Sequence, residues 1–240
     1  MTRQPLVSAH RSTEVPPPHL VDWELPPGWN WGLEGLSREH RHYQEVMDAL
    51  GRSLALVSAP NPEHGEWLAN EARALAHRNH PSIPTTYHYW ATYSANRRGP
   101  GYLRRWITGE TVASRVTRQG PETVPLVLQV LREAGSTLAY LHDTGSAHGA
   151  ISASTVWLTP GGRLWLLGWE WVLHRDQIPT GLRPDNRYTA WVPEWSPNVW
   201  APTPKSDQWQ LAALLFTALT GEVPPIDQVP PIALLRPDCP

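Results

Sequence analysis

A stretch in the middle of the chain carries the groups that bear most directly on chemistry. His148 lies in a loop after an apolar helical run, and Glu170 follows two short apolar runs separated by the turn Pro160-Gly161-Gly162. Glu170 is the only acidic residue between Thr144 and Arg175. Phosphoryl transfer requires oxygen ligands for Mg²⁺ and a separate carboxylate near the attacking hydroxyl. One carboxylate cannot fill both roles, so this stretch alone does not supply that chemistry.

The order of these elements resembles the catalytic loop, hairpin and metal-binding turn of a protein kinase, where H-x-D-x-x-x-x-N precedes D-F-G. In this chain His148, Ala150 and Thr155 stand at the His, Asp and Asn of the loop, and Gly168-Trp169-Glu170 stands at D-F-G. The spacing matches the family's. The resemblance implies that the catalytic aspartate and both metal-binding residues are replaced.

An upstream segment resembles the small lobe of the same family. Leu54 to Val57 is similar to the V-A-I-K strand, with Val57 at the lysine that pairs with the phosphates. Glu71, on a helix expected over residues 62–78, takes the position of the glutamate that pairs with this lysine. The glycine-rich loop that starts at Gly35 is poor, and we expect an ordinary solvated strand turn there.

Two large side chains are expected in the nucleotide cleft that the resemblance implies. Arg104 falls at the gatekeeper position, where a buried guanidinium needs a partner, and Glu71 is the candidate. Alternatively the count is off by one residue, and Arg104 and Arg105 are both solvated. Trp157 takes the strand residue under the adenine, where an indole fills volume meant for the base. If Trp157 turns into the core instead, a pocket remains.

The helices that follow supply the core and one anchoring acid. Residues 122–143 form an amphipathic helix, and a helix opens near Lys205 and ends at Gly221. Asp207 matches the aspartate that holds the catalytic-loop backbone in the family. We expect Trp169, His148 and Leu75 to form an internal column that rests on Asp207. The apolar stripe of the first helix consists of Leu126, Val127, Val130, Leu131, Ala134, Leu138 and Leu141.

The resemblance implies an α+β, two-lobed, kinase-like fold with a small β-rich N-lobe and a helical C-lobe that is truncated at its C-terminal end. The tail after Gly221 is rich in proline, which disfavours further helices. The expected divisions are a Pro-rich arm, an N-lobe, a C-lobe and a Pro-rich tail, over residues 1–30, 31–105, 106–225 and 226–240. Trp23, Trp29 and Trp31 either anchor the arm or belong to a disordered tail.

The predicted truncation points to an interaction surface. In the family, later helices cover this flank of the C-lobe and supply an arginine to the glutamate that Glu194 matches, so Glu194 is expected to be a structural residue. Arg236 in the tail is a candidate partner for Glu194, but one arginine does not replace the missing helices. Exposed apolar side chains on a flank mark a contact surface. We expect a protein partner, or a second copy, to bind at Trp195, Trp200, Trp209, Leu215 and Leu219. The alternative is that the tail and the tryptophan-rich segment that matches the activation segment fold over this flank and close a compact monomer.

Composition excludes several other classes of function. The net charge of −2 gives no electrostatic case for binding nucleic acid or an anionic membrane. The one cysteine allows no disulfide within the chain, and neither an apolar span nor a signal peptide is recognisable. We therefore expect a cytoplasmic protein without a cofactor or a metal ion.

These observations lead to a functional hypothesis with two alternatives. We expect a pseudokinase that is not an enzyme, binds ATP weakly or not at all, and acts as a protein-binding scaffold or allosteric regulator in signalling. One alternative is a rewired transferase that uses Glu170. The other is a receptor that binds a nucleotide without metal.

Overall fold

The chain divides into two compact units. The computed structural model describes residues 23–38, 41–59, 64–90, 100–176, 192, 201–225 and 228–237. Unit 1 comprises Met1–Ala69 and Thr86–Trp106, and unit 2 comprises Asn70–Thr85 and Ile107–Pro240. Helix α1 (Gly65–Leu75) therefore contributes residues to both units. The predicted domain boundaries stay predictions.

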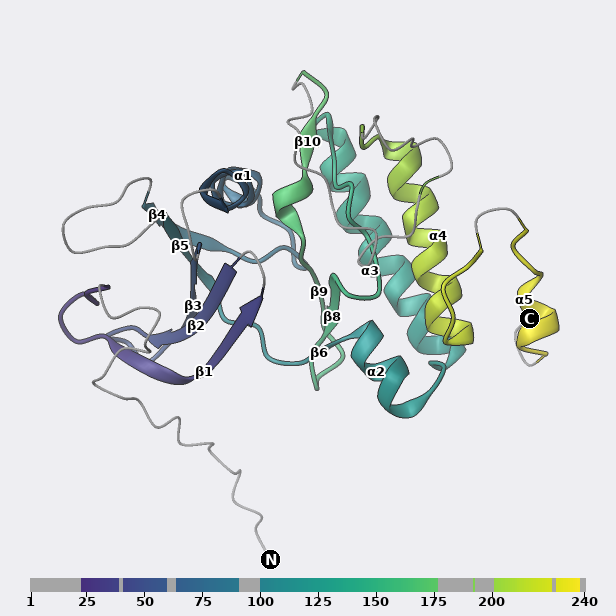
Figure 1. Ribbon diagram of the computed structural model, residues 1–240, viewed down its shortest axis with the longest axis horizontal. Helices are drawn as coiled ribbons and strands as arrows, with labels where there is room; N and C mark the ends of the chain where they lie inside the picture. Colours follow the sequence, from purple (N-terminus) through teal and green to yellow (C-terminus); the bar gives the residue numbers. More distant parts are fainter. Residues whose placement is uncertain are drawn as a thin grey trace, which may run out of the picture. The chain divides into compact units, whose positions relative to one another are not determined.

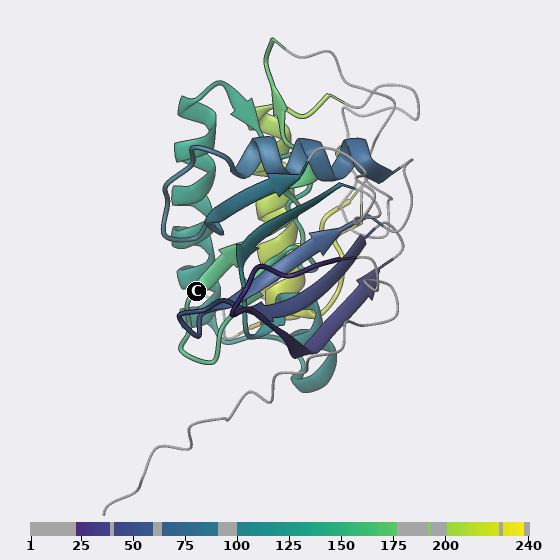
Figure 2. The ribbon, with the colours of Figure 1, turned by 90° about the vertical axis from the view of Figure 1, so that its left-hand side faces the viewer.

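Unit 1 is built on one antiparallel sheet with the strand order β1-β2-β3-β5-β4 (Figures 1 and 2). The alternating and β-branched residues of this region favour strands over helices. The segment expected as a solvated turn begins inside a strand, where Gly35 lies opposite Gln44, and its end at residues 39–40 lies outside the described residues. The strands are β1 (Asn30–Arg38), β2 (Arg41–Met47), β3 (Ser53–Ser58), β4 (Thr86–Trp90) and β5 (Gly101–Arg105).

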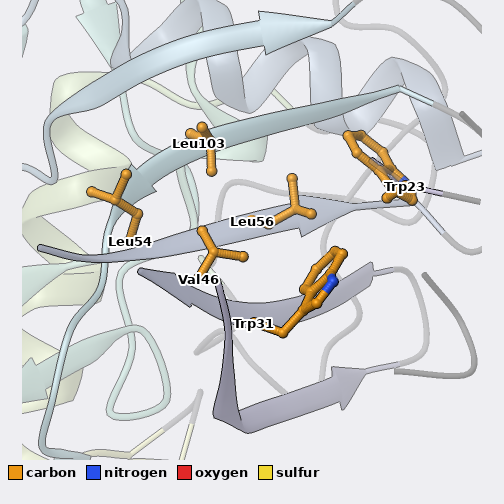
Figure 3. Close-up of a cluster of buried hydrophobic side chains, with 6 residues drawn as sticks. All are labelled: Trp23, Trp31, Val46, Leu54, Leu56 and Leu103. Carbon is orange, nitrogen blue, oxygen red and sulfur yellow. The ribbon is translucent and has the colours of Figure 1, made fainter. Parts of the chain in front are cut away.

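The core of this sheet includes one tryptophan that precedes β1 and one that lies near the start of β1. Figure 3 shows Trp23 and Trp31 among Val46, Leu54, Leu56 and Leu103, and all six side chains are buried. The rings of Trp23 and Trp90 meet edge to face with their centroids 5.5 Å apart. Trp23 and Trp31 thus belong to the core and Trp29 packs against it, while the arm before Trp23 lies outside the described residues.

Gly101 in β5 is required by this packing. A Cβ atom at Gly101 would overlap with the six-membered ring of Trp23. The indole therefore lies directly on the backbone of β5, where any larger residue would displace it.

Unit 2 is mainly helical, with two small sheets (Figure 1). The antiparallel strands β6, β8 and β9 form one sheet, and β7 pairs with β10 in the other. A 3₁₀ turn, η3 (Trp169–Trp171), follows β9. The helices of unit 2 besides the end of α1 are α2 (Val112–Gln119), α3 (Val124–Asp143), α4 (Pro204–Thr220) and α5 (Ile232–Leu235), and the strands are β6 (Glu110–Thr111), β7 (Ser146–Ala147), β8 (Val156–Leu158), β9 (Leu164–Leu166) and β10 (Leu173–His174).

Two expectations about the helices need correction. Helix α1 is shorter than the predicted span 62–78. In α3, Leu131 is 41% exposed and not part of the core, since it lies one residue, or about 100°, around the helix from the buried Val130. The other predicted members of the stripe are buried, except the half-buried Leu126.

Helix α4 has well-defined ends. Thr203 caps its N-terminus in a reciprocal capping box with Ser206, and Gly221 closes its C-terminus in the left-handed conformation, as predicted from the glycine.

Arg236 contacts the C-terminal end of α4. Its Nη1 donates to the carbonyl oxygens of Leu219 (2.7 Å) and Glu122 (3.2 Å). Leu219 lies in the last turn of α4, where backbone carbonyls lack intrahelical donors and where the helix dipole favours a cation. The predicted partner, Glu194, lies outside the described residues.

The α+β fold class is confirmed, with a β-sheet N-terminal region and a helical C-terminal part. None of the helices in the described part of the chain combines the length and apolar character that a membrane span requires.

The contact between Trp23 and Gly101 yields a first prediction. Gly101→Ala should lower the free energy of unfolding by about 1–3 kcal/mol, because the added methyl group forces the buried indole to move. Urea denaturation followed by tryptophan fluorescence measures the change. Gly135→Ala in α3 is the matched control, because nothing lies within 4 Å of that position. The control should be neutral or stabilising, and an equal effect of both substitutions would contradict the packing argument.

Candidate functional site

The site in unit 2 is organised by the carboxylate of Asp207, in the first turn of α4. Asp207 is completely buried. Its Oδ2 accepts hydrogen bonds from the backbone N–H of His148 (2.7 Å) and from Nε2 of His142 (2.8 Å), and its Oδ1 accepts from the N–H of Gly149 (2.8 Å). A buried carboxylate is stable only with such donors. Asp207 therefore fixes the start of the loop that contains His148.

Gln210, one turn further along α4, fixes the same loop on either side of Ala150. Its Oε1 accepts from the N–H of Ile151 (3.1 Å), and its Nε2 donates to the carbonyl of Gly149 (3.2 Å). Gln210 is completely buried. Because the two bonds flank Ala150, the backbone at the position of the family's catalytic aspartate is held without a functional side chain.

The end of the loop is closed by the hydroxyl of Thr155. Its Oγ1 donates to the carbonyl of Ala150 (2.8 Å) and accepts from the N–H of Ser152 (2.9 Å). Ala150 is 1% exposed, and its own N–H donates to Nδ1 of His148 (3.3 Å). The oxygen at the family's asparagine position is thus engaged inside the loop.

Gly168 occupies the position of the family's metal-binding aspartate in the left-handed conformation, with φ +90°. A Cβ atom there would lie 2.9 Å from Cγ2 of Thr155 and 3.4 Å from Cε1 of His148. Mg²⁺ takes oxygen ligands, and these positions offer one hydroxyl that is already bonded and no carboxylate. The residues present do not fit a divalent cation held as the family holds it.

Trp169 and His148 form a buried aromatic pair. Both are completely buried, and their rings meet edge to face with centroids 5.1 Å apart. The Trp169 Nε1 donates to the carbonyl of Leu166 (2.6 Å), and the guanidinium of Arg78 lies 5.8 Å from the centroid of the indole ring. Leu75, expected in the same column, is buried, and its place in that column stays a prediction.

The turn that contains Glu170 is held by a residue that sequence reasoning missed. The Nδ2 of Asn70 in α1 donates to the carbonyls of Glu170 (2.6 Å) and Val172 (3.1 Å). Backbone carbonyls about 100 residues away leave no sequence pattern. Gln210 was also missed, although its position three residues after Asp207 places it on a neighbouring part of the same helix surface.

The interior around His148 disfavours its charged form. Burial lowers the pKa of its imidazole to about 4. The carboxylates of Asp207 and Glu170 oppose this shift, and Arg78 and His142 add to it. Because Nδ1 accepts a hydrogen bond from Ala150, the neutral ring carries its proton on Nε2, for which the described residues provide no acceptor.

Two predicted site residues lie on the sheet of unit 1, Val57 at the lysine position and Arg104 at the gatekeeper position, and both are buried. Val57 in β3 is fully buried between Tyr43 and Tyr102 of the neighbouring strands. Arg104 in β5 is 6% exposed, so the alternative in which it is solvated is wrong. Its Nη1 donates to the carbonyl of Arg105 (2.9 Å), and its guanidinium lies 5.5 Å from the ring centroid of Tyr43.

The remaining predicted residues lie in unit 2 or outside the described part. Glu71 is buried on α1, and its pairing with Arg104 stays a prediction because it joins the two units. Trp157 on β8 is half-buried and lies opposite Thr111 and Trp165, and its cleft-filling role also stays a prediction. Of the proposed interface, Trp209 and Leu215 are half-buried, Leu219 is buried, and Trp195 and Trp200 lie outside the described residues.

The depressed pKa of His148 predicts a dependence of stability on pH. The folded state binds this proton less readily than the unfolded state, so stability is fully present above about pH 6.5 and is lost as pH falls toward 4. The total loss should be about 3 kcal/mol. Urea denaturation at a series of pH values measures it.

His148→Gln is the matched variant for this measurement, since it removes the titrating group. His80, whose pKa burial also lowers, remains and supplies a smaller slope of the same sign. An unchanged pH slope in His148→Gln would contradict the assignment to His148.

Comparison with known proteins identifies relatives of the chain. No protein-family model matches it. It is 26% identical over 192 residues to the serine/threonine-protein kinase PknA of Mycobacterium tuberculosis, covering 76% of this chain and 44% of that protein. It is 23% identical over 220 residues to PknB of Mycobacterium leprae, covering 89% and 35%. A protein of Arabidopsis thaliana named "Probable inactive receptor kinase" is 25% identical over 169 residues, covering 65% and 16%.

These relatives correct one prediction from the sequence. The chain was expected not to be an enzyme, but the mycobacterial relatives are named as serine/threonine-protein kinases, which overturns that exclusion. The chain spans less than half the length of these relatives. The sequence similarity, the α+β fold and the order of the loop, hairpin and turn all support the same relationship. The chain is related to the protein kinase superfamily.

Proposed function

We propose that this kinase-like chain is a protein-binding module that acts as a scaffold or allosteric regulator in signalling. The observation that carries the proposal is the clamp of Asp207 and Gln210 on the loop at residues 148–151. The clamp holds the backbone around Ala150 in a fixed shape, although Ala150 has no group that could act on a substrate. An ordered loop without an acid or base at this position supports recognition in preference to acid–base chemistry.

The outer face of α4 is the surface that we propose for the partner. Trp209 and Leu215 are half-buried. Gln208 and Ala212, which lie between them around the helix, are exposed. A large aromatic side chain that is partly buried and beside small or polar neighbours is a common anchor of an interface. The partner is a second copy of this chain or a different protein.

Sedimentation velocity over a range of concentrations tests the first possibility. Trp209→Ala should shift the equilibrium to the monomer and raise the dissociation constant at least about tenfold, as expected for an aromatic anchor. Leu128→Ala is the control, because Leu128 is an exposed apolar residue (52%) of a different helix, α3.

If the chain is a monomer, a photo-crosslinking amino acid at position 212 tests for a different partner. The same crosslinked protein should appear in repeated experiments in the host and be lost with Trp209→Ala, but not with Leu128→Ala. A strictly monomeric chain whose crosslinks ignore Trp209→Ala would contradict the proposed surface.

A second candidate is a phosphoryl transferase that uses Glu170. It is favoured by the names of the mycobacterial relatives and by the position of Glu170 in a turn that Asn70 holds. Transfer of labelled γ-phosphate to a protein substrate, measured with and without Mg²⁺, tests it. Turnover that Glu170→Gln abolishes would establish this candidate. Nucleotide binding by thermal shift without turnover would instead favour a receptor.

A further inference from the structure

One contact in unit 2 joins the loop before the β8–β9 hairpin to the turn after it and does not depend on the proposed function. A Cβ atom at Gly168 would lie 2.9 Å from the Cγ2 methyl of Thr155, which is closer than such carbon atoms approach in folded proteins. The same Cβ atom would also lie 3.4 Å from Cε1 of His148. The space beside Gly168 is therefore already filled by the side chains of the loop.

Neither neighbour can move aside without loss. The hydroxyl of Thr155 bonds to the carbonyl of Ala150 and to the N–H of Ser152, which fixes the direction of its methyl group. The ring of His148 is completely buried against Trp169, and its Nδ1 accepts from Ala150. Threonine is also restricted in χ1 because it is branched at Cβ.

We propose that Thr155 and Gly168 are a mutually dependent pair, in which the threonine methyl takes the space that any side chain at residue 168 requires. The pair links the loop at 148–155 to the turn at 168–171 by close packing. It follows that a carboxylate ligand for a divalent cation cannot be introduced by changing residue 168 alone.

A double-mutant cycle tests the dependence. Thr155→Ser removes the methyl group and keeps the hydroxyl, so it relieves the overlap and leaves the loop hydrogen bonds in place. We expect Gly168→Ala to raise the unfolding equilibrium constant at least about tenfold more in the native background than in the Thr155→Ser background. The strain of alanine at a positive φ is present in both backgrounds and cancels in the comparison.

Gly162→Ala is the matched control for the cycle. Gly162 has φ +79°, and its nearest neighbour, Nε2 of Gln129, lies 3.9 Å from a built Cβ. Its effect should be the same in both backgrounds. An effect of Gly168→Ala that Thr155→Ser does not change would overturn the proposal. Failure of both Gly168→Ala variants to fold would overturn it as well, since Thr155→Ser should restore folding.

Mn²⁺ provides an independent readout by its enhancement of water proton relaxation. Gly168→Asp in the native background should be destabilised and should bind Mn²⁺ no more tightly than the unsubstituted chain. If that variant keeps the native unfolding free energy and binds Mn²⁺ about tenfold more tightly, the space is available and the proposal is wrong.

Discussion

The site in the helical unit is organised around the buried carboxylate of Asp207. Asp207 accepts three N–H donors in an interior where an unpaired charge would cost several kcal/mol. Its place is set by the capped first turn of α4, and its donors come from the end of α3 and from the loop at 148–149. Two helices and a loop therefore converge on one group. The aromatic pair of His148 and Trp169 rests on the backbone that this carboxylate orients.

Shape and chemistry are separated at this site. The groups that orient the backbone are polar, buried and fully engaged, among them Asp207, Gln210 and Asn70. The positions that would touch a substrate or metal ion in the family hold Ala150, a bonded hydroxyl and a glycine. The architecture can persist because it is stabilised by donors and acceptors that the loop supplies from its own backbone, not by the groups that perform transfer.

Much of the fold could be predicted because its signals are local. The strand at Leu54–Val57, the long helix and the glycine that ends α4 follow from composition and periodicity over a few residues. The site residues that sequence reasoning missed have a common cause, since their partners are backbone groups distant in sequence. The clamps by Asn70 and Gln210 were not foreseen for this reason. A carbonyl is present at every residue, so its choice of partner cannot be read from residue types.

The packing of Trp23 shows that the stability of the sheet depends on a residue outside its strands. The indole that covers Gly101 belongs to a segment that precedes the first strand, so the folding unit extends beyond the hydrogen-bonded ladder. A peptide fragment cut at the first residue of β1 would retain every strand but lose one wall of the hydrophobic interior. The strand boundaries therefore exclude a residue that contributes to the stability of the sheet. A fragment that keeps this hydrophobic interior intact must therefore begin before Trp23 and not at Asn30.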